Sequence, residues 1–192
     1  MGIIKSAKET LDSSTLVLGR KAEGKTSYVI NELERKGLKN TLWIACDNTD
    51  TLKAALPDAD VAVIHQWSDF EEVYKSLVLS DTKYDSVVID GLSTLSSFFM
   101  DTTQYRLQDY GILGRKMLTH VAGLRGKFGD LYITLDLVPD EEGKTVLSVN
   151  RDLYRKITPF CNIRLCYVEA SDKNLTYAVQ TNSAKANKFR KN

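Results

Sequence analysis

The chain has 192 residues, 43% of them hydrophobic, and a formal net charge of +1. A chain of this length can bury about 70% of its unfolded surface in one core, so we expect a single domain over residues 1–192. No apolar run reaches the roughly 18 residues of a transmembrane helix and the first residues do not form a signal peptide, which excludes a membrane protein and predicts a cytoplasmic one, in the host cytoplasm if a phage encodes it.

Cysteine spacing and charge distribution narrow the function further. Cys46, Cys161 and Cys166 have no C-x-x-C spacing, so we expect reduced, buried side chains rather than a metal or disulfide site. The charge is uneven, because residues 1–100 carry a net charge of −4 and residues 101–192 a net charge of +5. An anionic partner would therefore meet the second half of the chain, although solvated charged faces without a partner give the same balance.

The first motif follows a mixed polar lead-in over residues 1–14. A short apolar strand runs into the sequence Gly19-Arg-Lys-Ala-Glu-Gly-Lys-Thr26, which fits the phosphate-loop pattern G-x-x-x-x-G-K-[ST], and a helical apolar face follows it. Glycines let backbone N–H groups converge on phosphates, Lys25 reaches the β- and γ-phosphates, and the Thr26 hydroxyl faces Mg²⁺. The pattern predicts a phosphate site formed by Gly19, Arg20, Lys21, Ala22, Glu23, Gly24, Lys25 and Thr26.

Two later strands are predicted to end in a carboxylate. Residues 41–46 form an apolar strand before Asp47, and residues 86–89 form a β-branched strand that ends at Asp90. Ligands of open α/β sheets lie at the carboxyl ends of the strands, and a carboxylate there can hold the water shell of Mg²⁺ beside Thr26. Asp90 therefore fits a Walker B motif, and Asp47 is placed at the same edge of the sheet.

The other elements of the first half are shorter. A brief helix over residues 51–56 and a short buried strand over residues 61–64 precede a helix over residues 69–79, which begins with a capping box. Residues 92–104 are expected to form a loop or short helix. Its aromatic side chains fit a core, although an aromatic loop could also stack bases.

The second half begins with the longest predicted helix, over residues 105–127, with His120 at the edge of its apolar stripe rather than acting as a base. A strand over residues 131–137 follows it. The remaining periodicity is close to two, which predicts a mostly antiparallel β C-terminal third before a basic tail over residues 181–192, with strands at residues 145–149, 163–168 and 175–180.

This order of elements resembles that of the RecA-like ATPases. Two strands are predicted between the phosphate loop and Asp90, unlike in the GTPase-like plan, and no N-K-x-D guanine motif is present. More narrowly, residues 14–190 resemble the small phage RecA-like ATPases of the single-strand-annealing (Sak) type. That resemblance is carried by residues 19–26, residues 86–91, Gln108-Asp-Tyr-Gly111 and the terminal Lys188-Phe-Arg190.

The resemblance implies an α/β P-loop NTPase fold of RecA-like type, with a mainly parallel central sheet, helices on both faces and C-terminal antiparallel strands. It also implies a Mg²⁺-dependent ATPase that forms a homo-oligomeric ring or filament and acts on single-stranded DNA in recombination or annealing. Asp47 takes the place of the catalytic glutamate, and Thr134 or Asp136 that of a polar sensor. Lys188 and Arg190 would reach the γ-phosphate of a neighbouring subunit.

DNA contacts are expected from the loops after Leu92 and Leu137, which in the resembled fold face the ring or filament axis. Arg151, Arg155 and Lys156 follow the predicted hairpin at such a place, and we expect them to neutralise DNA phosphates.

Departures from the family pattern keep two alternatives open. Asp47 is shorter than the expected glutamate and Glu23 adds a negative charge to the phosphate loop, which favours a non-hydrolysing, nucleotide-gated assembly factor or loader. The second alternative is a small-molecule kinase, which also needs a phosphate loop. Kinases of that kind carry an arginine-rich lid, and residues 92–127 contain only three arginines, spaced along one helix.

Overall fold

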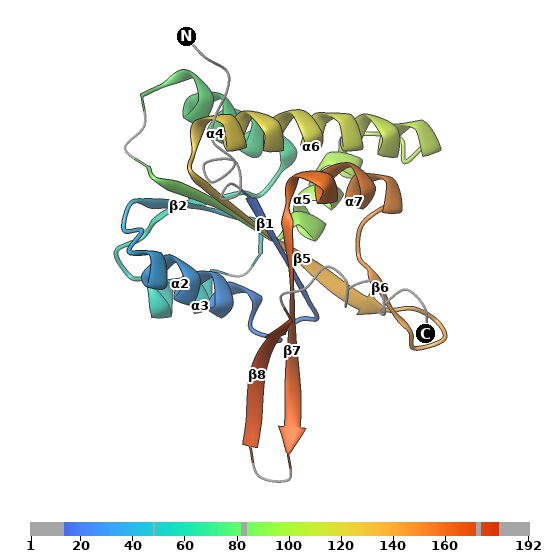
Figure 1. The fold of residues 1–192 in the computed structure, drawn as a ribbon. Helices are drawn as coiled ribbons and strands as arrows, with labels where there is room; N and C mark the ends of the chain where they lie inside the picture. The colour runs from blue at the N-terminus through green and yellow to red at the C-terminus, as the bar shows by residue number, and fades with distance from the viewer. Residues whose placement is uncertain (1–13, 48, 82–83, 172–173, 181–192) are drawn as a thin grey trace.

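The computed structural model describes residues 14–47, 49–81, 84–171 and 174–180, and they form an α/β structure around one central sheet (Figure 1). Strands and helices alternate through β5, as the sequence predicts. The strands are β1 (Ser14–Gly19), β2 (Thr41–Ala45), β3 (Asp60–Val63), β4 (Ser86–Asp90), β5 (Asp130–Pro139), β6 (Thr145–Leu147), β7 (Asn162–Ser171) and β8 (Asn174–Gln180). The helices are α2 (Lys25–Lys36), α3 (Asp50–Ala55), α4 (Trp67–Leu79), α5 (Leu92–Asp101), α6 (Leu107–Lys127) and α7 (Arg151–Ile157), followed by the 3₁₀ turn η1 (Thr158–Phe160).

The strand order in the sheet is β3-β2-β4-β5-β1-β7-β8, with β6 paired to β5. Every neighbouring pair from β3 to β7 is parallel, whereas β6 runs antiparallel to β5 and β8 antiparallel to β7. The predicted mainly parallel sheet with antiparallel C-terminal strands is therefore confirmed. Because β5 lies between β1 and β4, Asp136 of β5 lies beside Gly19 and the preceding Thr134 lies near Asp90, at one edge of the sheet.

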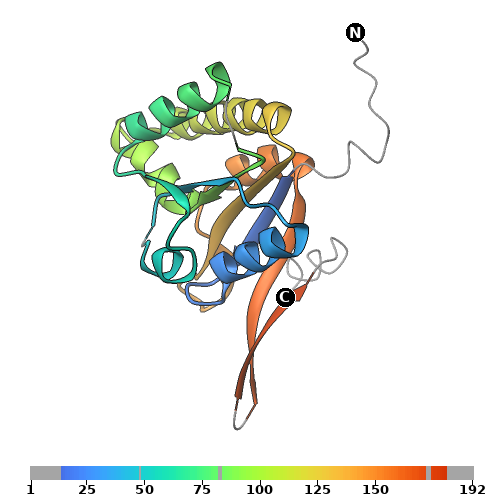
Figure 2. The ribbon, with the colours of Figure 1, turned by 90° about the vertical axis from the view of Figure 1, so that its left-hand side faces the viewer.

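Helices cover both faces of the sheet, as Figures 1 and 2 show from two directions. Side chains alternate between the faces along each strand, which gives two apolar layers. Helices α2 and α3 pack on the face that carries Val17, Trp43 and Tyr132. Helices α4 to α7 pack on the other face, where Leu16 and Ile44 are buried. In both views, β7 and β8 extend as a two-stranded hairpin beyond the rest of the sheet.

The C-terminal third differs from the prediction of mostly antiparallel strands. Helix α7 follows β6, and β7 then pairs in parallel with β1. The Asn150 side chain accepts a hydrogen bond from the Asp152 N–H at 2.7 Å and caps the helix, while Leu153, Tyr154 and Ile157 are buried at helical spacing. The period of two was therefore the wrong reading for residues 151–157.

The predictions for β3 and for the start of α4 are also corrected. Strand β3 is not buried: it is the last strand of the described sheet order, pairs with β2, and leaves Val63 44% exposed. The capping box of α4 lies earlier than predicted, because the Asp69 carboxylate accepts from the Gln66 N–H at 3.2 Å and the helix begins at Trp67.

His120 lies inside the core rather than at the edge of its helix. It is 8% exposed and packs against the rings of Trp67, Phe70 and Tyr74, with the nearest ring centroid, that of Tyr74, at 4.2 Å. Burial lowers the pKa of His120 from 6.5 to about 4, so the imidazole is neutral near pH 7. Its role in the described structure is to pack between α4 and α6.

No described helix combines the length and the apolar character needed to cross a bilayer. Within the described ranges there is also no group of three or more His, Cys, Asp or Glu side chains that could hold a metal ion.

Candidate functional site

The loop between β1 and α2 turns sharply so that the backbone leads into the first turn of the helix. Ala22 (φ 66°) and Gly24 (φ 78°) both have left-handed backbone conformations, and α2 begins at the next residue, Lys25. No side chain among the described residues caps this helix start, so its first N–H groups remain available to a ligand. Such a helix start favours an anion through its N–H groups and its dipole.

Gly19, the first glycine of the motif, is needed because two neighbours approach it closely. A Cβ atom at this position would lie 3.0 Å from the Cys166 carbonyl oxygen on β7 and 3.2 Å from Cγ of Lys25. Any larger residue would push the loop away from β7 or displace the Lys25 side chain. The first position of the motif thus has a packing reason in addition to backbone flexibility.

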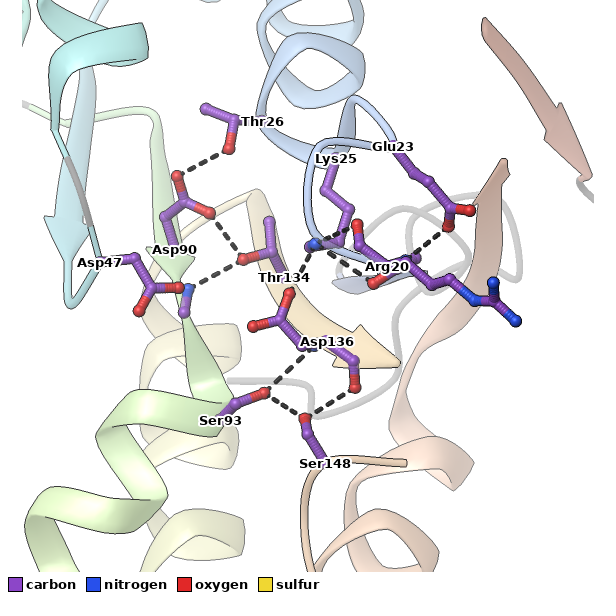
Figure 3. Close-up of polar contacts among 12 residues, drawn as sticks. Arg20, Glu23, Lys25, Thr26, Asp47, Asp90, Ser93, Thr134, Asp136 and Ser148 are labelled. Atoms are coloured by element: carbon purple, nitrogen blue, oxygen red, sulfur yellow. Dashed lines mark hydrogen bonds and ion pairs between the residues drawn. The ribbon is translucent and has the colours of Figure 1, made fainter. Parts of the chain in front are cut away.

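The ammonium group of Lys25 lies at the centre of the site and contacts three acceptors (Figure 3). It donates to the carbonyl oxygens of Gly19 at 3.2 Å and Arg20 at 3.0 Å, and it forms an ion pair with Asp136 Oδ1 at 2.6 Å. The Lys25 side chain is only 11% exposed. The predicted phosphate-binding lysine is therefore held at the carboxyl end of β5.

Thr26 and Asp90 lie together, as predicted for a metal pair, and Thr134 joins them. The Thr26 hydroxyl donates to Asp90 Oδ2 at 3.0 Å, and the Thr134 hydroxyl donates to Oδ1 at 2.6 Å (Figure 3). Thr134 also accepts from the Gly91 N–H at 2.8 Å. Thr134, one of the two sensor candidates, is thus the second hydroxyl that donates a hydrogen bond to the Asp90 carboxylate.

The Asp90 carboxylate lies in an environment that disfavours its negative charge, so a bound cation would stabilise it. Burial raises the pKa of Asp90 above its ordinary value, and the charge of Asp47 adds to this rise. Hydrogen bonds from Thr134 and Thr26 and the charge of Lys25 lower it in part. A hydroxyl and a carboxylate side by side are oxygen ligands of the type that Mg²⁺ prefers, with phosphate oxygens and water completing its shell, so these residues fit the metal.

Asp47 lies at the end of β2 and faces Asp90 across Gly91. It accepts a hydrogen bond from the Thr94 hydroxyl, and its Oδ2 atom would lie 2.6 Å from a Cβ atom at Gly91. Gly91 has a φ of 103° and precedes α5. The exposed Asp47 carboxylate therefore lies against Gly91, near enough to Asp90 for its charge to act on that carboxyl, whereas Asp50 begins α3.

Asp136 also connects three elements through its backbone, which the sequence did not indicate. Its N–H donates to Ser93 Oγ at 3.1 Å, and its carbonyl oxygen accepts from the Ser148 N–H at 3.1 Å and the Ser148 hydroxyl at 2.7 Å. The two serine hydroxyls are 2.5 Å apart. The carboxyl end of β5 is therefore fixed to the start of α5 and to the segment after β6.

Glu23 and Arg20 turn in different directions from the loop. The Glu23 carboxylate accepts from the Arg20 N–H at 2.5 Å, so its charge stabilises the loop itself. The Arg20 guanidinium leaves the loop and donates to the Thr145 hydroxyl on β6. The candidate phosphate loop thus contacts the β5–β6 hairpin directly.

A groove of about 650 Å³ lies beside that hairpin, between β6, α7 and β7. Leu147, Ile163 and Leu165 are among its partly buried apolar lining residues. Arg151 and Arg155 lie at its edge and are exposed, and neither forms a hydrogen bond or ion pair with the described residues. A second hollow, of about 590 Å³, lies at the other end of α2 and is remote from the loop.

The remaining predicted site residues are placed elsewhere. Lys156 does not line the groove, because its ammonium group forms an ion pair with Asp152 at 2.5 Å and packs near Gly114 of α6. Lys188 and Arg190, predicted to act on a neighbouring subunit, lie outside the described residues. Ser93, Thr94 and Ser148 were missed because no motif marks them.

These strand and helix positions define an α/β protein with a mostly parallel central sheet, which is consistent with a RecA-like fold. The structure is similar to the crystal structure of the flagellar accessory protein FlaH from Methanocaldococcus jannaschii, with a TM-score of 0.53 and 9% sequence identity, over 88% of this chain and 77% of that chain. At this identity the similarity shows the fold alone. No protein-family description matches the sequence, and no curated protein matches it either.

Proposed function

We propose that this protein binds ATP with Mg²⁺ at the loop between β1 and α2 and hydrolyses it. The observation that carries the proposal is the arrangement at the start of α2, which no described side chain caps. Lys25 lies there beside Thr26, and the Thr26 and Thr134 hydroxyls both donate to the Asp90 carboxylate. Phosphates need converging donors, and a metal-bound phosphate needs a hydroxyl and a carboxylate beside it. All of these groups come from the carboxyl edge of one parallel sheet, where α/β proteins bind ligands.

Each residue has a distinct role in the proposed reaction. The loop N–H groups and Lys25 bind the phosphates, while Thr26 and Asp90 hold the metal, which when bound neutralises charge on the transferred phosphoryl group. Asp47 orients and deprotonates the attacking water, because it is an exposed carboxylate beside Gly91 whose charge reaches Asp90.

Calorimetric titration with Mg·ATP tests the binding step. Lys25→Ala should abolish measurable binding, because it removes the central cation of the loop, yet the variant should fold, since its Asp136 partner is 30% exposed. Lys53→Ala, which changes an exposed lysine on α3, is the matched control and should bind as the parent does. Equal affinity of Lys25→Ala and the parent would refute the proposal.

Product analysis separates hydrolysis from the two alternatives. Release of ADP and phosphate supports an ATPase, transfer of the phosphoryl group to an added acceptor supports a kinase, and binding without turnover supports a nucleotide-gated assembly factor. The last alternative is supported by the similarity in fold to FlaH, a flagellar accessory protein. The ATPase is favoured because the exposed Asp47 carboxylate lies beside Gly91, the residue after the candidate metal ligand Asp90.

We further propose that single-stranded DNA binds along the groove, in a phage-type recombination or annealing protein. The supporting observation is that the exposed guanidinium groups of Arg151 and Arg155 have no hydrogen-bond or ion-pair partner among the described residues and line a groove with several apolar side chains. Loss of both should reduce the slope of log affinity against log salt by about 1.4, at about 0.7 per phosphate contact. Arg115→Ala, on the exposed side of α6, should leave the slope unchanged.

Assembly into a ring or filament remains part of the proposal through Lys188 and Arg190. If these side chains act on the neighbouring subunit, a chain without residues 185–192 should hydrolyse slowly. Mixing it with Lys25→Ala subunits should then restore some activity at shared boundaries. Proven co-assembly without recovery would remove this role.

A further inference from the structure

The Asp136 carboxylate occupies one of the three hydrogen-bonding positions of the Lys25 ammonium group. The other two go to carbonyl oxygens of the loop, so all three ammonium protons have acceptors within the protein. A phosphate that binds Lys25 must therefore replace one of these contacts. The carboxylate, at 2.6 Å, is the nearest of the three acceptors.

A phosphate oxygen that reaches Lys25 would also lie close to a negative charge. Like charges within about 4–6 Å disfavour each other, and the partly buried position of the pair weakens screening by solvent. Asp90 ends the neighbouring strand β4 and Asp47 follows β2, one strand further along the sheet, and both add to the negative potential on the same side. The Asp136 carboxylate contacts this loop through the Lys25 ammonium group, whereas no side chain among the described residues caps the N–H groups at the helix start.

We propose that Asp136 determines nucleotide specificity by opposing the γ-phosphate, so that the site binds a nucleoside diphosphate at least as tightly as the triphosphate. This inference rests on the proposed nucleotide site. The β-phosphate is bound mainly by loop N–H groups, which Asp136 does not touch. The γ-phosphate needs Lys25 as well, and it must take that lysine from Asp136.

Asp136→Asn isolates this effect because the side chain and the backbone of the residue have separate partners. The backbone bonds to Ser93 and Ser148 do not depend on the carboxylate, so the end of β5 keeps its position. The amide is nearly the same size and is neutral. The variant should fold like the parent, which its thermal midpoint and circular dichroism spectrum verify.

Asp130→Asn is the matched control. Asp130 lies on the same strand and forms an ion pair with Lys36 of the same helix, but at the opposite end of both elements. Its substitution removes an equivalent Asp–Lys contact far from the loop. Any change that both variants share would therefore reflect general charge or stability and not a local effect on the γ-phosphate.

The experiment measures dissociation constants of Mg·ADP and of a non-hydrolysable Mg·ATP analogue by calorimetry for the parent and both variants. Asp136→Asn should tighten the triphosphate on the order of tenfold and the diphosphate distinctly less, since one opposing charge near the γ-phosphate is removed. Asp130→Asn should leave the ratio of the two constants at the parent value.

Three outcomes would overturn the inference. Equal tightening of both nucleotides would show that Asp136 does not distinguish the γ-phosphate, and weaker triphosphate binding would show that the carboxylate assists it, for instance through the metal. A parent that prefers the triphosphate strongly would also contradict it. The proposed function fails in a different way, namely if the parent and both variants bind neither nucleotide.

Discussion

The Thr134 hydroxyl donates to the Asp90 carboxylate at 2.6 Å and simultaneously accepts from the N–H of Gly91, the residue after Asp90. One buried side chain on β5 therefore holds both the carboxylate and the backbone of the neighbouring strand tip. The hydrogen bond also offsets part of the burial that raises the pKa of Asp90.

Thr134→Val should destabilise the fold by about 1–3 kcal/mol, because Thr134 is 1% exposed and its loss removes the hydroxyl that contacts Asp90 Oδ1 and the Gly91 N–H. It should also raise the pKa of Asp90 further and weaken Mg²⁺-dependent nucleotide binding. Urea unfolding and Mg²⁺ titration measure the two effects. Thr134→Ser retains the hydroxyl and should restore most of the Mg²⁺ dependence. If Val and Ser behave alike, the hydroxyl has no part in holding Asp90.

Asp47→Asn should lower the turnover of ATP by about 10²–10⁴-fold while leaving nucleotide affinity within a few-fold, because a general base acts in the transition state rather than in binding. Asp50→Asn, in the first turn of α3, is the comparison. Steady-state phosphate release gives the rates. Retained turnover in Asp47→Asn with a loss in Asp50→Asn would assign the base to Asp50.

Gly91→Ala should reduce both stability and turnover. The added Cβ atom would lie 2.6 Å from Asp47 Oδ2, and the φ of 103° is unfavourable for alanine. Gly143→Ala offers a control with a φ of 77° and no heavy atom within 4 Å of the new Cβ, so it carries the backbone cost of about 1 kcal/mol alone. Gly91→Ala should therefore lower the free energy of unfolding by at least about 1 kcal/mol more than Gly143→Ala does. Equal losses would show that Asp47 moves aside freely.

His120→Leu should remove a pH dependence of stability. The native pKa of about 4 lies below the ordinary 6.5, so the unfolded chain binds the proton first as the pH falls. The parent should therefore lose about 2 kcal/mol of unfolding free energy between pH 7 and pH 5 from this group, with the loss complete near pH 4. Glu71 and Lys116 lie near the ring and act in opposite directions on its pKa.

The measurement is the urea midpoint of parent and His120→Leu at pH 7 and pH 5. A leucine also removes the buried Nδ1 atom that has no hydrogen-bond partner among the described residues, so the variant need not be less stable at pH 7. An unchanged pH slope in the variant would place the titrating group elsewhere.

Local signals were sufficient for most of the fold. The loop from Gly19 to Thr26 and the C-terminal end of α2 at Gly37, which has a φ of 69°, follow from residues adjacent in sequence. The pairing of Thr26 with Asp90 also followed, because both belong to motifs whose chemistry requires a common metal. Such features need no knowledge of which strands are neighbours.

The features that sequence could not supply depend on strand order. Thr134 and Asp136 were recognised only as alternatives for one polar position, whereas the structure gives each its own partner, Asp90 and Lys25 respectively. Helix α7 was missed for a different reason: it has 7 residues, too few for periodicity to outweigh the β pattern on both sides, although the Asn150 cap was a usable signal.

The position of β5 in the sheet also has a consequence during synthesis on the ribosome. Ser14 of β1 pairs with Leu131 of β5, and Thr15 pairs with Asn162 of β7, so the first described strand has its ladder partners far along the chain. Contacts of such sequence separation form slowly and late. A nascent chain that already displays the whole Gly19–Thr26 loop therefore still lacks both strands that hold it. Under the proposed function, the loop would gain both supporting strands, and with them its nucleotide site, only after β7 has been translated.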